Sequence, residues 1–110
     1  MLDDLHAATF AAHVHTTFRI DLSSTEAIAL ELVEVKDGAS PGEKPPTAVA
    51  DQERFSIMFR GPHDRLLQQG MYRIQHDQLG AFELFLVPVG QDRHGLYYEA
   101  VFNRVWRGHG

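Results

Sequence analysis

Hydrophobic and polar residues alternate with period two along most of the chain. In residues 17–22, Phe18, Ile20 and Leu22 fall on one face and polar side chains on the other, which is typical of a half-buried strand. Similar patterns, or short runs that are apolar throughout, recur further on. The six predicted strands are residues 17–22, 28–35, 55–59, 72–76, 81–87 and 96–106.

Two of these strands carry an irregularity. After Leu32 the apolar positions shift to Val33 and Val35, which predicts a β-bulge near Leu32–Val33, because one extra residue changes the face of every later side chain. Residues 81–87 are apolar on both faces. This run predicts a central or curved strand that hides Leu84, Phe85, Leu86 and Val87 together.

Helical spacing is confined to short segments. Leu5, Ala8 and Ala12 recur at intervals of three and four, which predicts a short N-terminal helix. Residues 63–69 are expected to form one helical turn, with Leu66 and Leu67 directed inward. The stretch Asp77–Gly80 is typical of a hairpin turn.

The 110 residues fit one domain, 1–110, since a single core typically takes about 100–150 residues. Short links between strands favour a mainly β fold, an antiparallel barrel or curled sheet of about six strands with one short N-terminal helix. Three of the five prolines lie in a predicted flexible loop at about 37–52, and a short tail follows at about 107–110.

Composition excludes several functional classes. The chain has no cysteine and a net charge of -5, so it is no thiol enzyme or zinc ribbon and carries the wrong sign for general phosphate-backbone binding. The acidic N-terminus and the short apolar runs predict no signal peptide and no membrane span. We therefore expect a cytoplasmic protein.

Charge also differs between the two halves. Residues 1–53 hold ten acids and three bases, whereas residues 54–110 hold five acids and seven arginines. This asymmetry fits either a head-to-tail interface between copies or neutralisation within one domain, and interspersed charge within a domain is the commoner case.

No catalytic motif is present. The chain lacks a Gly-x-Ser-x-Gly elbow, a Gly-x-Gly-x-x-Gly loop and a Walker lysine motif. We expect no enzyme activity and no cofactor. Glu83 and Glu99 lie within apolar strands, where burial raises a carboxyl pKa, but alternation favours outward, paired structural carboxylates.

Seven histidines raise the question of a metal site. An extended His13–Val14–His15 stretch would put two imidazoles on one face, and two imidazoles can ligate zinc or nickel. A third ligand would come from His6, His63 or His76, but no known ligand spacing connects them with the pair. Surface histidines are the favoured interpretation.

A small basic and aromatic cluster lies near the C-terminus, formed by Arg104, Trp106 and Arg107. Trp106 could stack on a base or sugar. Closure of a barrel edge by Trp106 is the favoured interpretation, because one tryptophan beside two arginines in an acidic chain is a faint nucleic-acid signal.

The second half of the chain contains five sequence blocks, Phe55–Pro62, Leu67–Tyr72, Leu79-Gly80, Leu84–Gly90 and Tyr98–Asn103. In this order they resemble a family of uncharacterised bacterial domains of unknown function, and the similarity covers about residues 7–104. The family supplies no catalytic or ligand residues. Its genes resemble companions of phage-tail-like, tail-collar proteins, which implies an accessory or assembly role.

Two functional hypotheses remain. The favoured one is a non-enzymatic β-module that associates with itself or with a protein partner, through a sheet edge or through a face carrying Tyr72 and Tyr97, with Trp106 as a further candidate. The alternative is a ligand-binding or enzymatic barrel with a site around Arg60, His76, Tyr97 and Glu99. An apolar barrel interior would argue against this alternative.

Overall fold

The computed structural model describes residues 5–37 and 52–105, with side chains over 5–36 and 54–102. Most of the predicted loop at 37–52 lies outside these residues, as do Trp106, Arg107 and the tail at 107–110. The side chain of Arg104 is likewise not described.

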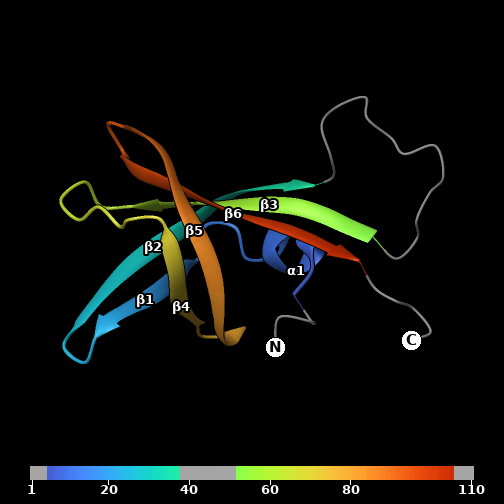
Figure 1. Ribbon diagram of the computed structural model, residues 1–110, viewed down its shortest axis with the longest axis horizontal. Helices are drawn as coiled ribbons and strands as arrows, with labels where there is room; N and C mark the ends of the chain where they lie inside the picture. The colour runs from blue at the N-terminus through green and yellow to red at the C-terminus, as the bar shows by residue number, and fades with distance from the viewer. Residues whose placement is uncertain (1–4, 38–51, 106–110) are drawn as a thin grey trace.

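The described chain forms six antiparallel strands that close into a barrel, preceded by one short helix (Figure 1). The elements are α1 (Ala7–Ala11), β1 (Thr17–Ser23), β2 (Glu26–Asp37), β3 (Gln52–Gly61), β4 (Gly70–His76), β5 (Gly80–Asp92) and β6 (Gly95–Val105). Around the barrel their order is β1-β2-β3-β6-β5-β4. The predicted fold class is confirmed.

Closure depends on strands that change neighbours along their length. β5 pairs with β4 through Leu86 and with β6 only from Val87 onward. β3 and β6 stay paired throughout and run side by side beyond the point where β5 turns away (Figure 1). β1 meets β4 only at Arg19–Gln75 and Ile20–Ile74.

Inward-facing residues of every strand fill the barrel. The alternation predicted for residues 17–22 and 55–59 is confirmed, and that for 96–106 is confirmed as far as residue 102, since the residues of the predicted inner face are buried or packed on the core. Val101, on the predicted outer face, is 70% exposed. The register between β2 and β3 shifts between Leu32 and Glu34. The shift confirms the predicted bulge and returns Val35 to the core.

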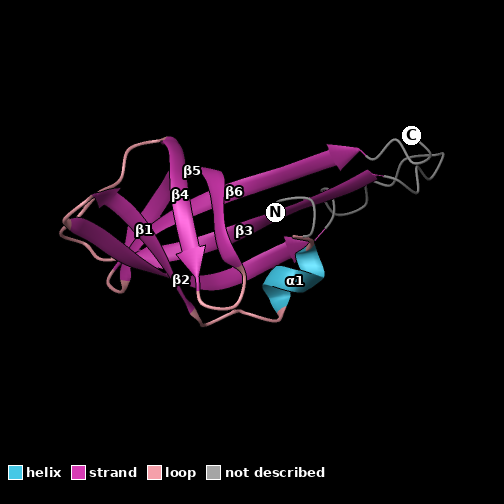
Figure 2. Ribbon diagram, turned by 90° about the horizontal axis from the view of Figure 1, so that it is seen from below, coloured by secondary structure: helices cyan, strands magenta, loops and turns pink. Residues whose placement is uncertain are grey.

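Helix α1 lies at one end of the barrel, against β2 and β3 (Figure 2). Its Phe10 side chain is fully buried. The ring lies 6.1 Å from Phe82 on β5 and 5.5 Å from Phe102 on β6, between centroids, and it also contacts Phe18 and Phe55. Phe10 therefore fills the gap that the divergence of β5 and β6 leaves. No helix in the described part of the chain is long and apolar enough to cross a membrane.

Two local predictions were wrong. Residues 63–69 form no helical turn; only a turn at His63–Asp64 is present, and the Leu67 N–H donates to the Tyr98 hydroxyl at 3.0 Å. That bond fixes an extended segment with Leu67 inside, while Leu66 is 62% exposed.

The second error concerns β5. Leu84 and Leu86 are buried, but Phe85 is 47% exposed and Val87 only partly buried. In the described structure the barrel covers the inner face of β5 alone, so its outer face stays in solvent.

Replacing Phe10 should test the role of α1. Phe10→Ala should lower the free energy of unfolding by about 3–5 kcal/mol, because it opens a cavity among four aromatic rings. Phe85→Ala is the matched control, since it removes the same group from the surface and should cost less than about 1 kcal/mol. Urea titration of both variants measures the difference, and equal losses would contradict the role assigned to Phe10.

Candidate functional site

A polar network crosses the outer surface of three adjacent strands. Arg60 on β3 lies opposite Glu31 on β2 and Tyr97 on β6. Its guanidinium donates to Glu31 Oε1, and a hydrogen bond with Tyr97 is the main cause that raises its pKa. Glu31 also holds His15 Nδ1 at 2.9 Å, and that bond is the first cause that lowers the Glu31 pKa.

The network continues to the β5–β6 turn. The Tyr97 hydroxyl donates to Asp92 Oδ2 at 2.9 Å, and the His94 N–H donates to Asp92 Oδ1 at 2.8 Å. The pKa of Asp92 is lowered, chiefly by that His94 bond. A Cβ atom on Gly95 would lie 2.4 Å from the Gly61 carbonyl oxygen, so only glycine lets this turn approach the end of β3.

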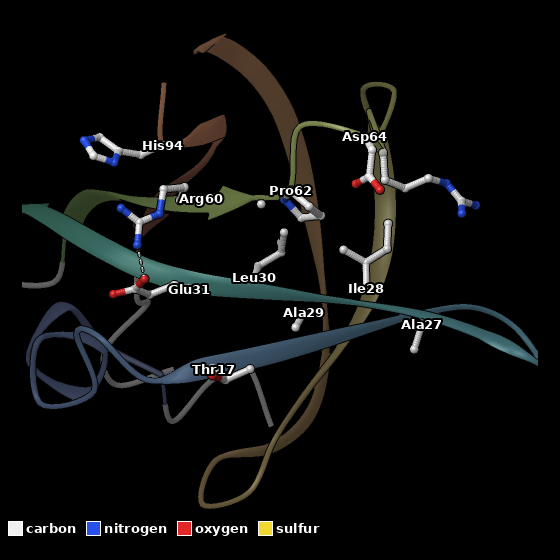
Figure 3. Close-up of a pocket in the computed structure, with 12 residues that line it drawn as sticks. Thr17, Ala27, Ile28, Ala29, Leu30, Glu31, Arg60, Pro62, Asp64 and His94 are labelled. Atoms are coloured by element: carbon white, nitrogen blue, oxygen red, sulfur yellow. Dashed lines mark hydrogen bonds and ion pairs between the residues drawn. The ribbon is translucent and has the colours of Figure 1, made fainter. Parts of the chain in front are cut away.

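Beside the network is an open groove with a volume of about 630 Å³ (Figure 3). One wall is β2 from Ala27 to Glu31, and the other is the segment from Arg60 to Arg65 with His94 above it. Two ion pairs involve residues that line the groove: Glu31 pairs with Arg60, and Arg65 pairs with Glu26. The volume lies within the range of small-molecule sites, about 300–1,000 Å³.

A second polar cluster lies inside the barrel wall around His76, which is 8% exposed. Its Nδ1 accepts the N–H groups of Gln78 and Leu79 at 3.0 and 3.2 Å. The neutral ring therefore carries its proton on Nε2, which donates to Thr16 Oγ1 at 2.9 Å. Thr16 in turn donates to the His13 carbonyl at 2.6 Å.

Burial is the main cause that lowers the His76 pKa, followed by the charge of nearby His13. The two imidazole rings meet edge to face, 4.8 Å between centroids. Both nitrogens of His76 are occupied by hydrogen bonds, so this cluster joins the chain before β1 to the β4–β5 turn as a structural link.

The histidine pair proposed as a metal site does not form the geometry that it requires. Residues 12–15 are a turn rather than an extended stretch, and His15 adopts a left-handed φ of 74°. His13 packs on His76, whereas His15 contacts Glu31. Within the described residues no three metal-ligating side chains converge.

The four residues of the predicted ligand site do not meet at one point. Arg60 and Tyr97 are neighbours on the outer surface, but His76 is buried beneath Phe18, 4.4 Å between rings. Glu99 lies opposite Met58 and Val87 on the outer face. The inner face of the barrel is lined by apolar side chains.

The remaining candidates separate as well. Glu83 is exposed, directly opposite Arg73, as alternation predicted. Tyr72 packs against the core and donates its hydroxyl proton to the Gln68 carbonyl at 2.6 Å, so it does not share a face with Tyr97. The side chains of Arg104, Trp106 and Arg107 lie outside the described residues.

Sequence reasoning missed Glu31 and Asp92, which complete the surface network. Glu31 carried one usable signal, since it alternates outward in its strand. Only the pairing of β2 with β3 and of β3 with β6 brings Glu31 and Tyr97 to opposite sides of Arg60, and alternation alone does not give that register.

These features define a small closed antiparallel β-barrel whose interior is packed with its own side chains and whose polar network and groove lie on the outer surface. The chain belongs to the family described as a domain of unknown function, DUF6916, which matches residues 5–102. No curated protein and no solved structure matches it.

The pKa of His76 predicts a loss of stability in weak acid. Because burial lowers the folded value below the ordinary 6.5, stability is fully present above that pH and falls as the pH drops through the folded pKa. Urea titrations between about pH 7.5 and pH 5 should show this fall. Glu26, Glu31 and Asp92 have lowered pKa values, so their contribution is lost only in stronger acid.

The same titration of His76→Gln should give a lower stability at neutral pH and a flatter dependence between the two pH limits. His94→Gln provides the control, as the same replacement in the exposed β5–β6 turn. If the free energy of unfolding of His76→Gln changed with pH as steeply as that of the wild type, the His76 ring would not be the cause of the pH dependence.

Proposed function

We propose that the protein is a non-enzymatic interaction module, an accessory or assembly protein that acts in the cytoplasm through contact with a protein partner or with its own copies. The observation that carries the proposal is an apolar pair on the outer face of β4 and β5. Met71 and Phe85 lie directly opposite each other and are 63% and 47% exposed.

This pair has the composition of a small interface centre. Arg73 and Glu83, the next outward pair on the same two strands, border it with opposite charges. Apolar centres with polar rims are typical of protein interfaces, and side chains such as Phe and Met are enriched there. Further exposed apolar residues of the described chain are Leu66, Val89 and Val101.

The packed interior supports the same proposal. Small barrels that bind ligands need open space inside, whereas inward side chains of this barrel include Phe59, Ile74 and Leu86, each fully buried. An assembly role in phage-tail-like systems is a further part of the proposal, which rests on the family resemblance alone.

A charge placed in the apolar pair tests the proposal. Phe85→Lys should weaken self-association or partner capture about tenfold or more, since losing one buried phenylalanine costs about 1.5–3 kcal/mol. Sedimentation velocity over a wide concentration range, with affinity purification from the native host, provides the measurement.

Ser24→Lys is the matched control, with the same charge on the exposed β1–β2 turn, and it should associate like the wild type. A wild-type monomer at every concentration with no partner would overturn the proposal. So would unchanged association of Phe85→Lys.

A further inference from the structure

The groove beside β2 contains an open strand edge. Leu32 exchanges hydrogen bonds with the chain before β1: its N–H donates to the Thr16 carbonyl at 3.2 Å, and its carbonyl accepts the His15 N–H at 2.7 Å. In an antiparallel ladder such pairs recur every second residue. Register with β1 is regular from Glu31 back to Ala27, so Leu30 and Ile28 also direct their backbone groups toward β1.

The intervening residues direct their backbone groups to the opposite side. Glu31 meets Arg60 of β3 there. The ladder ends at this point, and Ala29 and Ala27 have no strand partner on that side among residues 5–37 and 52–105. Two N–H groups and two carbonyls of β2 thus face the groove.

Pro62 explains why β3 does not continue along β2. It would stand opposite Ala29 if the register continued, but proline has no N–H to donate. The chain turns away at His63–Asp64, and the groove lies between β2 and this segment (Figure 3).

We propose that this groove binds an extended peptide segment of a partner protein, which adds to β2 alongside Ala27–Ala29. The backbone carries the recognition: the two alanine N–H groups donate to peptide carbonyls, and peptide N–H groups donate to the two alanine carbonyls. Strand addition to an exposed edge is an established mode of peptide recognition.

The side chains around the groove indicate which residue types the bound peptide should have. Ala27 and Ala29 are small and exposed, so bulky outward side chains fit opposite them. Ile28 is buried between them, which favours one apolar, β-branched residue on the inner side of the peptide. Asp64 lines the groove, and Glu26 lies beside it, paired with the lining residue Arg65. The two carboxylates share this one arginine, so their excess negative charge favours basic residues at the peptide termini.

This site is independent of the Met71–Phe85 pair. Two strands separate β2 from β5 in either direction around the barrel. Peptide binding therefore stands if the apolar pair proves inert, and Phe85→Lys should bind the peptide like the wild type.

The test uses a capped pentapeptide, acetyl-Lys-Thr-Val-Thr-Lys-amide, titrated into the full chain and followed by amide NMR shifts. Shifts should be confined to residues 27–31 and 61–65, and amide exchange of Ala27 and Ala29, fast in the free protein, should slow on binding. A peptide with both threonine amides N-methylated has the same side chains but lacks two donors, and should bind at least about tenfold more weakly.

A variant of the protein complements this peptide control. Ala29→Pro removes the Ala29 N–H, which pairs with no strand in the free protein, and it should abolish the shifts. If this variant does not fold, the comparison with the N-methylated peptide tests the proposal by itself. Absence of binding at millimolar peptide overturns the proposal. Equal binding of the N-methylated peptide, shifts located elsewhere, or slow exchange of Ala27 and Ala29 in the free protein would each overturn it too.

Discussion

The barrel depends on the burial of one aromatic side chain, Phe10. β5 leaves β6 before Val87 in order to pair with β4, and without a further element the core between Phe82 and Phe102 would face water. A buried aromatic ring removes a large apolar area from solvent, worth a few kcal/mol. Helix α1 has only five residues, too few for stability of its own, so its contact with the core maintains both the helix and the closed end.

The sequence predicts the strands well because each strand has one face toward solvent and one toward the core. This difference appears in the sequence as period-two alternation of polar and apolar residues. The bulge at Leu32 and Val33 is predicted from the point where the alternation shifts by one residue. The errors arise where alternation carries no information. Leu66 and Leu67 are chemically alike, and a long-range contact, the hydrogen bond from the Leu67 N–H to the Tyr98 hydroxyl, accompanies the burial of Leu67. Phe85 is apolar and exposed, a combination that a local pattern does not distinguish from a covered strand.

The candidate site was less predictable than the fold, since it depends on which strands are neighbours. Residue type indicates Arg60 and Tyr97 as candidates, and the β3–β6 register does place them opposite each other. Residue type also groups His76 with them, although nothing in the sequence fixes its distance from the pair. Its position under Phe18, with both ring nitrogens bonded, gives it a structural role, because a nitrogen that already donates or accepts a bond within the wall has no free capacity for a ligand.

Because the barrel is filled with its own side chains, both proposals place recognition on the outer surface, where two features differ in kind. The Met71–Phe85 pair exposes apolar area, which gains free energy from any surface that excludes water and so discriminates weakly among partners. The β2 edge exposes backbone donors and acceptors, which require a partner in extended conformation and in register. In the two proposals together, affinity and geometric selectivity come from opposite sides of one small barrel. Such a division would suit a component that joins two neighbours at once, because each contact could be occupied without disturbing the other.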